Sequence, residues 1–155
     1  MCAGRRVFAG SNLFAKGACY RAAELVGEEA PKPYLFFGAD KIPCNVGIRI
    51  LNGQRDGMQV LIPAGVNWYE AKAKCEVLLY DKPVVEILFQ PLKGETMLKE
   101  SILLDGLPQR PARTTRLKVQ VSFTRAAQCQ VQILDLGFGE LYPATDLMWN
   151  ETVEL

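Results

Sequence analysis

The chain has 155 residues, 49% hydrophobic and 23% charged, a composition that suits one packed domain with a short attachment and excludes extensive disorder. Its 18 basic and 17 acidic residues give a net charge of +1, so no overall field favours nucleic acid or an anionic membrane as a partner. Histidine is absent, which removes His-based triads and the commonest metal ligand. Without a signal peptide or a run that spans a bilayer, we expect a cytoplasmic protein.

The first predicted element is a helix over residues 11–27. Ser11 or Asn12 is a suitable N-cap, apolar residues recur at helical spacing, and Gly27 suits the C-terminal cap. Residues 28–33 contain two prolines, which is typical of a linker. Because the helix carries an apolar stripe, a homodimer through residues 11–27 is one partner arrangement to consider.

From residue 34 onward the hydrophobic period changes to two, which predicts short strands separated by turns. Turn signals predict loops at 54–57 and 135–140. This pattern predicts a mainly β fold, an antiparallel β-sandwich with one N-terminal α-helix. The predicted strands are 46–50, 58–62, 71–79, 84–90, a segment through Ile102 and Leu104, 117–123, 129–133 and 152–155.

Neither the cysteines nor the carboxylates form a recognisable chemical site. The five cysteines are odd in number and form no C-x-x-C pair, and Cys75 and Cys129 fall at apolar positions of predicted strands. We expect them to be reduced packing residues. With no catalytic arrangement and no metal motif apparent, we expect a protein that is not an enzyme and that holds no metal.

Several segments, in one order along the chain, resemble the DnaK-type heat-shock chaperone family. The segment FAKGACYRAAELVG (14–27) resembles the last helix of its ATPase domain, V-A-x-G-A-A-x-Q-A-A-x-L-x-G. The segment DKIPCNVGIRILNG (40–53) resembles the opening of its peptide-binding β-domain, D-V-x-P-L-S-L-G-I-E-T-x-G-G. Further similar segments are VLIP (60–63), DKPVVEI (81–87), LDGLPQRPAR (104–113) and CQVQILD (129–135).

The resemblance implies two parts. Residues 1–33 would be the terminal helix of an ATPase-like domain with its linker, and residues 34–155 the sandwich that binds peptides or partners. In the family, ATP hydrolysis belongs to sequence upstream of this helix, so we expect no cofactor here and ATP only through an upstream domain. That domain would regulate binding through an apolar interdomain linker, which the resemblance places at Tyr34, Leu35, Phe36, Phe37 and Asp40.

By matched position, the resemblance also implies a groove for extended apolar peptides, in which main-chain hydrogen bonds give affinity and a pocket gives preference. The outward apolar pair Val84 and Leu88 sets one of its strands apart, because a single apolar face satisfies a core. The alternative is that these residues are ordinary packing and that the domain is a protein–protein docking or assembly module with a degenerate groove. The implied peptide-binding residues are Ile48, Leu51, Val85 and Ile87.

Two further groups of residues have two interpretations each. Trp68 and Tyr69 are either an exposed anchor for a partner or a cap on one end of the sandwich. The basic residues near the proline-rich crossing either gather as a basic edge or form a solvated surface with modest pairing. These are Arg110, Arg113, Arg116 and Lys118.

Overall fold

The computed structural model describes residues 13–27, 38–53, 55–92 and 96–155. The chain divides into two units, residues 1–35 and residues 36–155. Within the described residues, no helix is long and apolar enough to cross a membrane. The predicted linker at residues 28–33, the helix cap at Ser11 or Asn12, and linker residues Tyr34 to Phe37 lie outside the described residues.

In the first unit, the described residues 13–27 form one helix, α1 (Leu13–Val26). The amide of Gly27 donates to the carbonyl of Ala23 at 2.8 Å, so the helix ends where the glycine was predicted to end it. Phe14 and Val26 are almost fully exposed.

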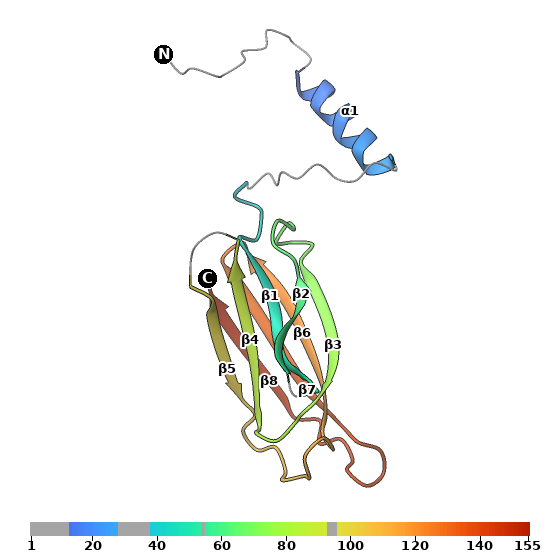
Figure 1. Ribbon diagram of the computed structural model, residues 1–155, viewed down its shortest axis with the longest axis vertical. Coiled ribbons are helices and arrows are strands. Elements are labelled where there is room, and N and C mark those ends of the chain that lie inside the picture. The colour runs from blue at the N-terminus through green and yellow to red at the C-terminus, as the bar shows by residue number, and fades with distance from the viewer. Residues whose placement is uncertain (1–12, 28–37, 54, 93–95) are drawn as a thin grey trace. The chain divides into compact units, whose positions relative to one another are not determined.

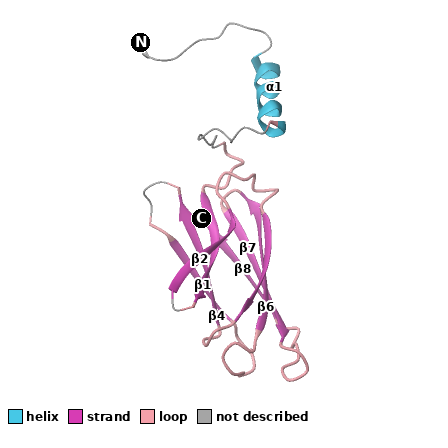
Figure 2. Cartoon of the chain, turned by 45° about the vertical axis from the view of Figure 1, so that its right-hand side comes forward, coloured by secondary structure: helices cyan, strands magenta, loops and turns pink. Residues whose placement is uncertain are grey.

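The second unit is a sandwich of two antiparallel four-stranded sheets, which confirms the predicted fold class (Figures 1 and 2). The first sheet has the order β2-β1-β4-β5 and the second has the order β3-β6-β7-β8. The strands are β1 (Cys44–Asn52), β2 (Arg55–Ile62), β3 (Lys72–Leu78), β4 (Val84–Pro91), β5 (Leu98–Leu103), β6 (Arg116–Arg125), β7 (Gln128–Gly137) and β8 (Met148–Glu154).

The core lies between the two sheets and is built from alternate residues of each strand. In β6, for example, Leu117, Val119, Val121 and Phe123 are buried, and the residues between them face outward. The two sheets contribute to one cluster, which includes Val46 and Ile87 of the first sheet and Val131 and Ile133 of the second. Cys44 and Cys129 are buried in this cluster and Cys75 packs against it, and all three are free thiols, as predicted.

Parts of two predicted loops belong to strands instead. Residues 55–57 belong to β2 because they continue its register with β1, and the reversal is confined to a tight turn in which Gly53 has a φ of 69°. Residues 135–137 belong to β7 because pairing with β6 extends as far as Gly137. In both places long-range strand pairing outweighs local turn signals.

Candidate functional site

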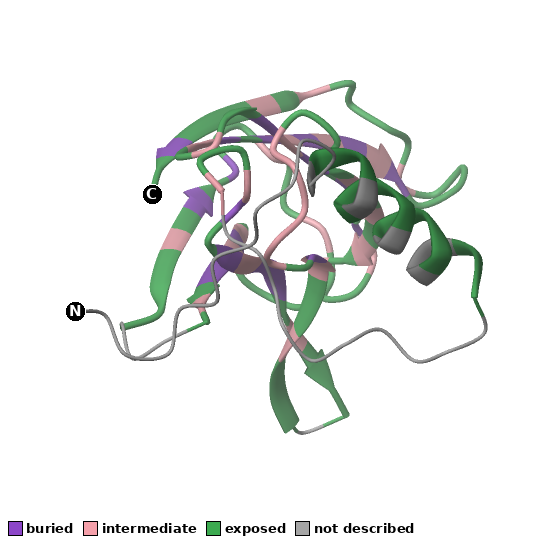
Figure 3. Cartoon of the chain, turned by 90° about the horizontal axis from the view of Figure 1, so that it is seen from above, coloured by how far each residue is buried: buried purple, intermediate pink, exposed green. Residues whose placement is uncertain are grey.

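The first sheet splits between β1 and β4. The ladder between these strands ends at Ile48 and Ile87. Beyond that pair, β1 continues to Asn52 with β2 as its partner, and β4 begins at Val84 with β5 as its partner. We call this region the fork; it comprises residues 48–52 of β1 and 84–87 of β4. Figure 3 shows the end of the β1–β2 hairpin reaching out from the other strands.

All four residues of the predicted groove lie at the fork, but they differ in exposure. Ile48 and Ile87 form its last pair, Val85 lies on the β4 arm, and all three are buried in the core. Leu51 lies on the β1 arm and is 51% exposed. Three of the four side chains are therefore closed off from solvent, and their contact with a peptide stays a prediction.

The outward apolar pair on β4 is present as predicted. Leu88 is only 8% exposed, yet it lies outside the core cluster, while its chain neighbours Ile87 and Phe89 belong to it. Val84, also on the outer face, is half-buried and lies opposite Leu103 of β5, which is well exposed. The outer face of the first sheet is thus partly apolar at the fork.

Four charged side chains cross the outer face of the first sheet, one from each strand. Nε of Arg49 on β1 donates to the carboxylate of Asp56 on β2, at 2.8 Å to Oδ1 and 2.9 Å to Oδ2. Nη1 of Arg49 donates to Oε2 of Glu86 on β4 at 2.5 Å. Glu86 also pairs with Lys99 on β5. The signs alternate along this row, so its net charge is zero.

The row holds its carboxylates in the ionised form. Hydrogen bonds from Lys99 and then Arg49 lower the pKa of Glu86, and a hydrogen bond from Arg49 lowers the pKa of Asp56. The pKa of Arg49 is raised by its bonds to Asp56 and Glu86. The Arg49–Glu86 pair is the member of this row that spans the fork.

A second feature lies at the end of the sandwich where the proline-rich crossing passes. Arg110 makes a bidentate ion pair with Asp135, both bonds being 2.9 Å, and its side chain is 5% exposed. It also donates to the carbonyl of Pro143 at 2.8 Å. The interpretation of Arg110 as part of a solvated surface is therefore wrong, because its charge is satisfied by a buried carboxylate.

The other basic residues of the crossing do not form one basic edge. The Arg113 guanidinium lies 5.0 Å from the ring centre of Tyr80, and Arg116 approaches Glu76 at 3.7 Å on the surface. Lys118 lies on the outer face of the second sheet. These residues follow the solvated-surface interpretation, with Arg110 as the exception.

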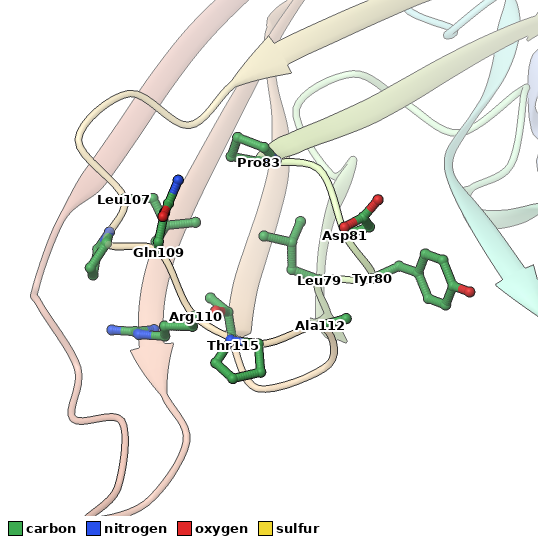
Figure 4. Close-up of a pocket in the computed structure, with 11 residues that line it drawn as sticks. Leu79, Tyr80, Asp81, Pro83, Leu107, Gln109, Arg110, Ala112 and Thr115 are labelled. Carbon is green, nitrogen blue, oxygen red and sulfur yellow. The ribbon is translucent and has the colours of Figure 1, made fainter.

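A cavity of about 180 Å³ opens between the crossing and the loop that joins β3 to β4. Figure 4 shows Leu79 and Pro83 on one side of it and Leu107 and Gln109 on the other, while Tyr80 points away. The cavity includes none of the four residues of the predicted groove.

The opposite end of the sandwich carries the predicted aromatic pair and the last linker residue. Trp68 is half-buried against the core, whereas Tyr69 is 52% exposed, and their rings meet edge to face at 5.6 Å. The Trp68 amide donates to the carbonyl of Asp40 at 3.0 Å, which ties the described end of the linker to this loop. Trp68 therefore caps the sandwich, and Tyr69 remains open to solvent.

The comparisons with known proteins divide the chain close to the boundary between its two units. Residues 41–155 match the family described as "Domain of unknown function (DUF8552)". The chain belongs to this family. The DUF8552 domain therefore comprises the whole sandwich and the fork. Residues 1–39 match the family described as "Family of unknown function (DUF5716) C-terminal". Among curated proteins, nothing matches the chain.

Sequence reasoning missed the charged row of the DUF8552 domain and the Arg110–Asp135 pair. A usable signal was present for Glu86, which is the lone charge in the apolar run 84–89. Arg49 stands at a polar position of the alternating pattern in residues 46–50. Neither pattern identifies the ion-pair partner of its residue, because the partners lie on other strands and the order of the strands in the sheet is not apparent from the sequence. Among the described residues, no group of His, Cys, Asp and Glu side chains could hold a metal ion.

Proposed function

We propose that residues 41–155 form a non-enzymatic binding domain that holds an extended, apolar polypeptide segment at the fork, as the resemblance to DnaK-type chaperones implies. The observation that carries this proposal is that the β1–β4 ladder ends at Ile48 and Ile87 although both strands continue. Strand edges without a neighbour are templates for pairing with another chain. Main-chain hydrogen bonds to such edges supply affinity that does not depend on sequence.

The side chains around the fork indicate what such a segment must look like. Successive residues of a strand point to opposite faces of the sheet. A segment between the two arms would direct every second side chain toward Ile50 and Val85, which pack in or against the core. Those positions favour apolar residues, because a polar side chain buried there would lose its hydrogen bonds to water. The remaining positions would face Leu51, Val84 and the charged row.

The wider context of this proposal follows the resemblance. An upstream ATPase domain would regulate binding through the linker at residues 34–40, in a cytoplasmic protein. The hydrogen bond from Trp68 to Asp40 gives the linker a fixed contact with the sandwich. This contact is at the end that carries the loop between β2 and β3, so regulation through it would act along β1, which runs from that end to the fork.

A docking or assembly module remains the second candidate function, and one observation favours it. Ile48, Val85 and Ile87 are fully packed in the core, so a fork that never opens would leave only the outer face for binding. A docking module would ignore short apolar peptides, whereas the fork should select them.

The test is a titration of the chain against a labelled, leucine-rich extended peptide, followed by fluorescence anisotropy. We expect saturable binding that is lost in Leu51→Asp, because a carboxylate on the β1 arm would be desolvated by the bound segment. Leu78→Asp is the matched control, since Leu78 is 52% exposed and lies on β3 of the other sheet. A folded wild-type protein that binds no peptide would contradict the proposal and favour docking.

A further inference from the structure

The row of four charges on the first sheet is divided by the fork into two pairs. Arg49 and Asp56 both belong to the β1–β2 hairpin, and Glu86 and Lys99 both belong to the β4–β5 pair of strands. Each of these two ion pairs joins side chains on the same side of the fork. The Arg49–Glu86 contact is the one in the row that joins the two sides.

The Arg49–Glu86 contact lies just beyond the point where backbone pairing between β1 and β4 ends. The β1–β4 ladder ends at Ile48 and Ile87, and Arg49 and Glu86 are the next residues on the two arms. Beyond the last backbone pair, the two arms are thus joined on the outer face by a side-chain bridge. A segment that pairs with both arms holds them about 9.6 Å apart, because neighbouring strands lie about 4.8 Å apart, and it therefore lengthens the distance that the Arg49–Glu86 bridge has to span.

Breaking the bridge leaves no charge without a partner. Arg49 keeps its bonds to Asp56, which are made by Nε as well as by the guanidinium end. Glu86, the most shielded of the four at 19% exposure, keeps Lys99. Opening the fork therefore converts one neutral row into two neutral pairs, and it avoids the large penalty of an unpaired, shielded charge.

We propose that the Arg49–Glu86 ion pair is a releasable clasp across the fork, which an incoming apolar segment must open and which sets the affinity for that segment. This inference rests on the proposed function of the fork. The clasp opposes binding, so its removal strengthens binding. The pairs within each arm have no such effect, because they persist in the open state.

The test compares two carboxylates that share Arg49 as a partner. Glu86→Gln removes the contact across the fork together with the Lys99 pair within its own arm, and Asp56→Asn removes a contact within the β1–β2 hairpin. Binding of the labelled, leucine-rich peptide is measured by anisotropy for the whole chain and both variants. We expect Glu86→Gln to lower Kd by about two- to fivefold, which corresponds to the interaction free energy of a solvent-exposed ion pair. We expect Asp56→Asn not to lower Kd.

The possible results separate the clasp from the proposed function. Peptide binding by the wild-type chain with an unchanged or higher Kd in Glu86→Gln overturns the clasp and leaves the binding function standing. An equal gain in Asp56→Asn also overturns the clasp, since it would point to a general effect of charge removal. No binding by any folded variant overturns the binding function and the clasp with it. If Glu86→Gln does not fold, Arg49→Gln removes the same contact and takes its place.

Discussion

Asp135 and Arg110 form an ion pair that is closed off from solvent at the end of β7. The carboxylate also accepts hydrogen bonds from Oγ1 of Thr145 at 2.7 Å and from the amides of Thr145 and Gly137. Burial opposes ionisation of Asp135, but the hydrogen bonds from Arg110, Thr145 and the two amides outweigh it and lower the pKa to about 2. One carboxylate thus fastens the proline-rich crossing and the loop before β8 to the same strand.

The lowered pKa of Asp135 predicts that the folded protein is less stable at acid pH. Because the folded pKa is depressed below the value of about 3.9 for an unfolded chain, the stability from Asp135 is fully present above about pH 5. It is lost progressively as the pH falls from about 5 to 1, and amounts to about 2.6 kcal/mol at one pKa unit per 1.36 kcal/mol. Urea unfolding across pH 2–6 should show this loss in the wild-type chain and a weaker one in Asp135→Asn.

The control for that series is Glu76→Gln, which removes the surface pair with Arg116 and should leave the pH dependence almost unchanged. A slope in Asp135→Asn that equals the wild-type slope would show that the buried pair is not the source of the acid sensitivity.

The edge strands β5 and β8 each carry a glutamate on the face that points into the sandwich. Glu100 lies opposite Ile87, and Glu151 lies opposite Val131, and both of these partners are core residues. Cross-strand partners share a face of the sheet, so both glutamates lie on the inward face at an edge of their sheet. Inward charges at edge strands oppose pairing between molecules, because a second sheet edge would bury them.

For these elements we expect Glu100→Val and Glu151→Val to increase self-association. Each variant replaces the inward charge of a free edge with a residue that favours strands. Sedimentation velocity at increasing protein concentration measures the effect. Glu154→Val is the control, since Glu154 lies on the same strand as Glu151 but on its outer face, opposite Gln128. Monomeric behaviour of both inward variants would contradict this role for the glutamates.

Much of the whole molecule was predictable from the sequence because it depends on short-range patterns. Period-two burial along β3, β6 and β7 places the core, and the helical spacing places α1. The parts that were not predictable depend on neighbours distant in sequence. Gly137 is typical of a turn, yet it ends β7, where a Cβ would lie 2.4 Å from the carbonyl oxygen of Tyr142. The glycine is needed for close backbone approach as well as for its φ of 61°.

In the candidate site, too, some features were predictable from the sequence and others were not. Ile48, Leu51, Val85 and Ile87 were placed by resemblance, and the structure brings them to one fork. The burial of Ile48, Val85 and Ile87 was not predictable, because an alternating pattern does not distinguish a core from a groove beside it. The Arg49–Glu86 bridge was not predictable either, since the two residues lie 37 positions apart and meet only through the strand order β2-β1-β4-β5.

Pairing of an extended apolar segment with both arms of the fork would be seen in hydrogen–deuterium exchange measured with and without the leucine-rich peptide. We expect added protection at the amides of residues 49–51 on β1 and 84–86 on β4, with little change in the second sheet. Saturating peptide that protects other segments, or that leaves both arms unchanged, would contradict the claim.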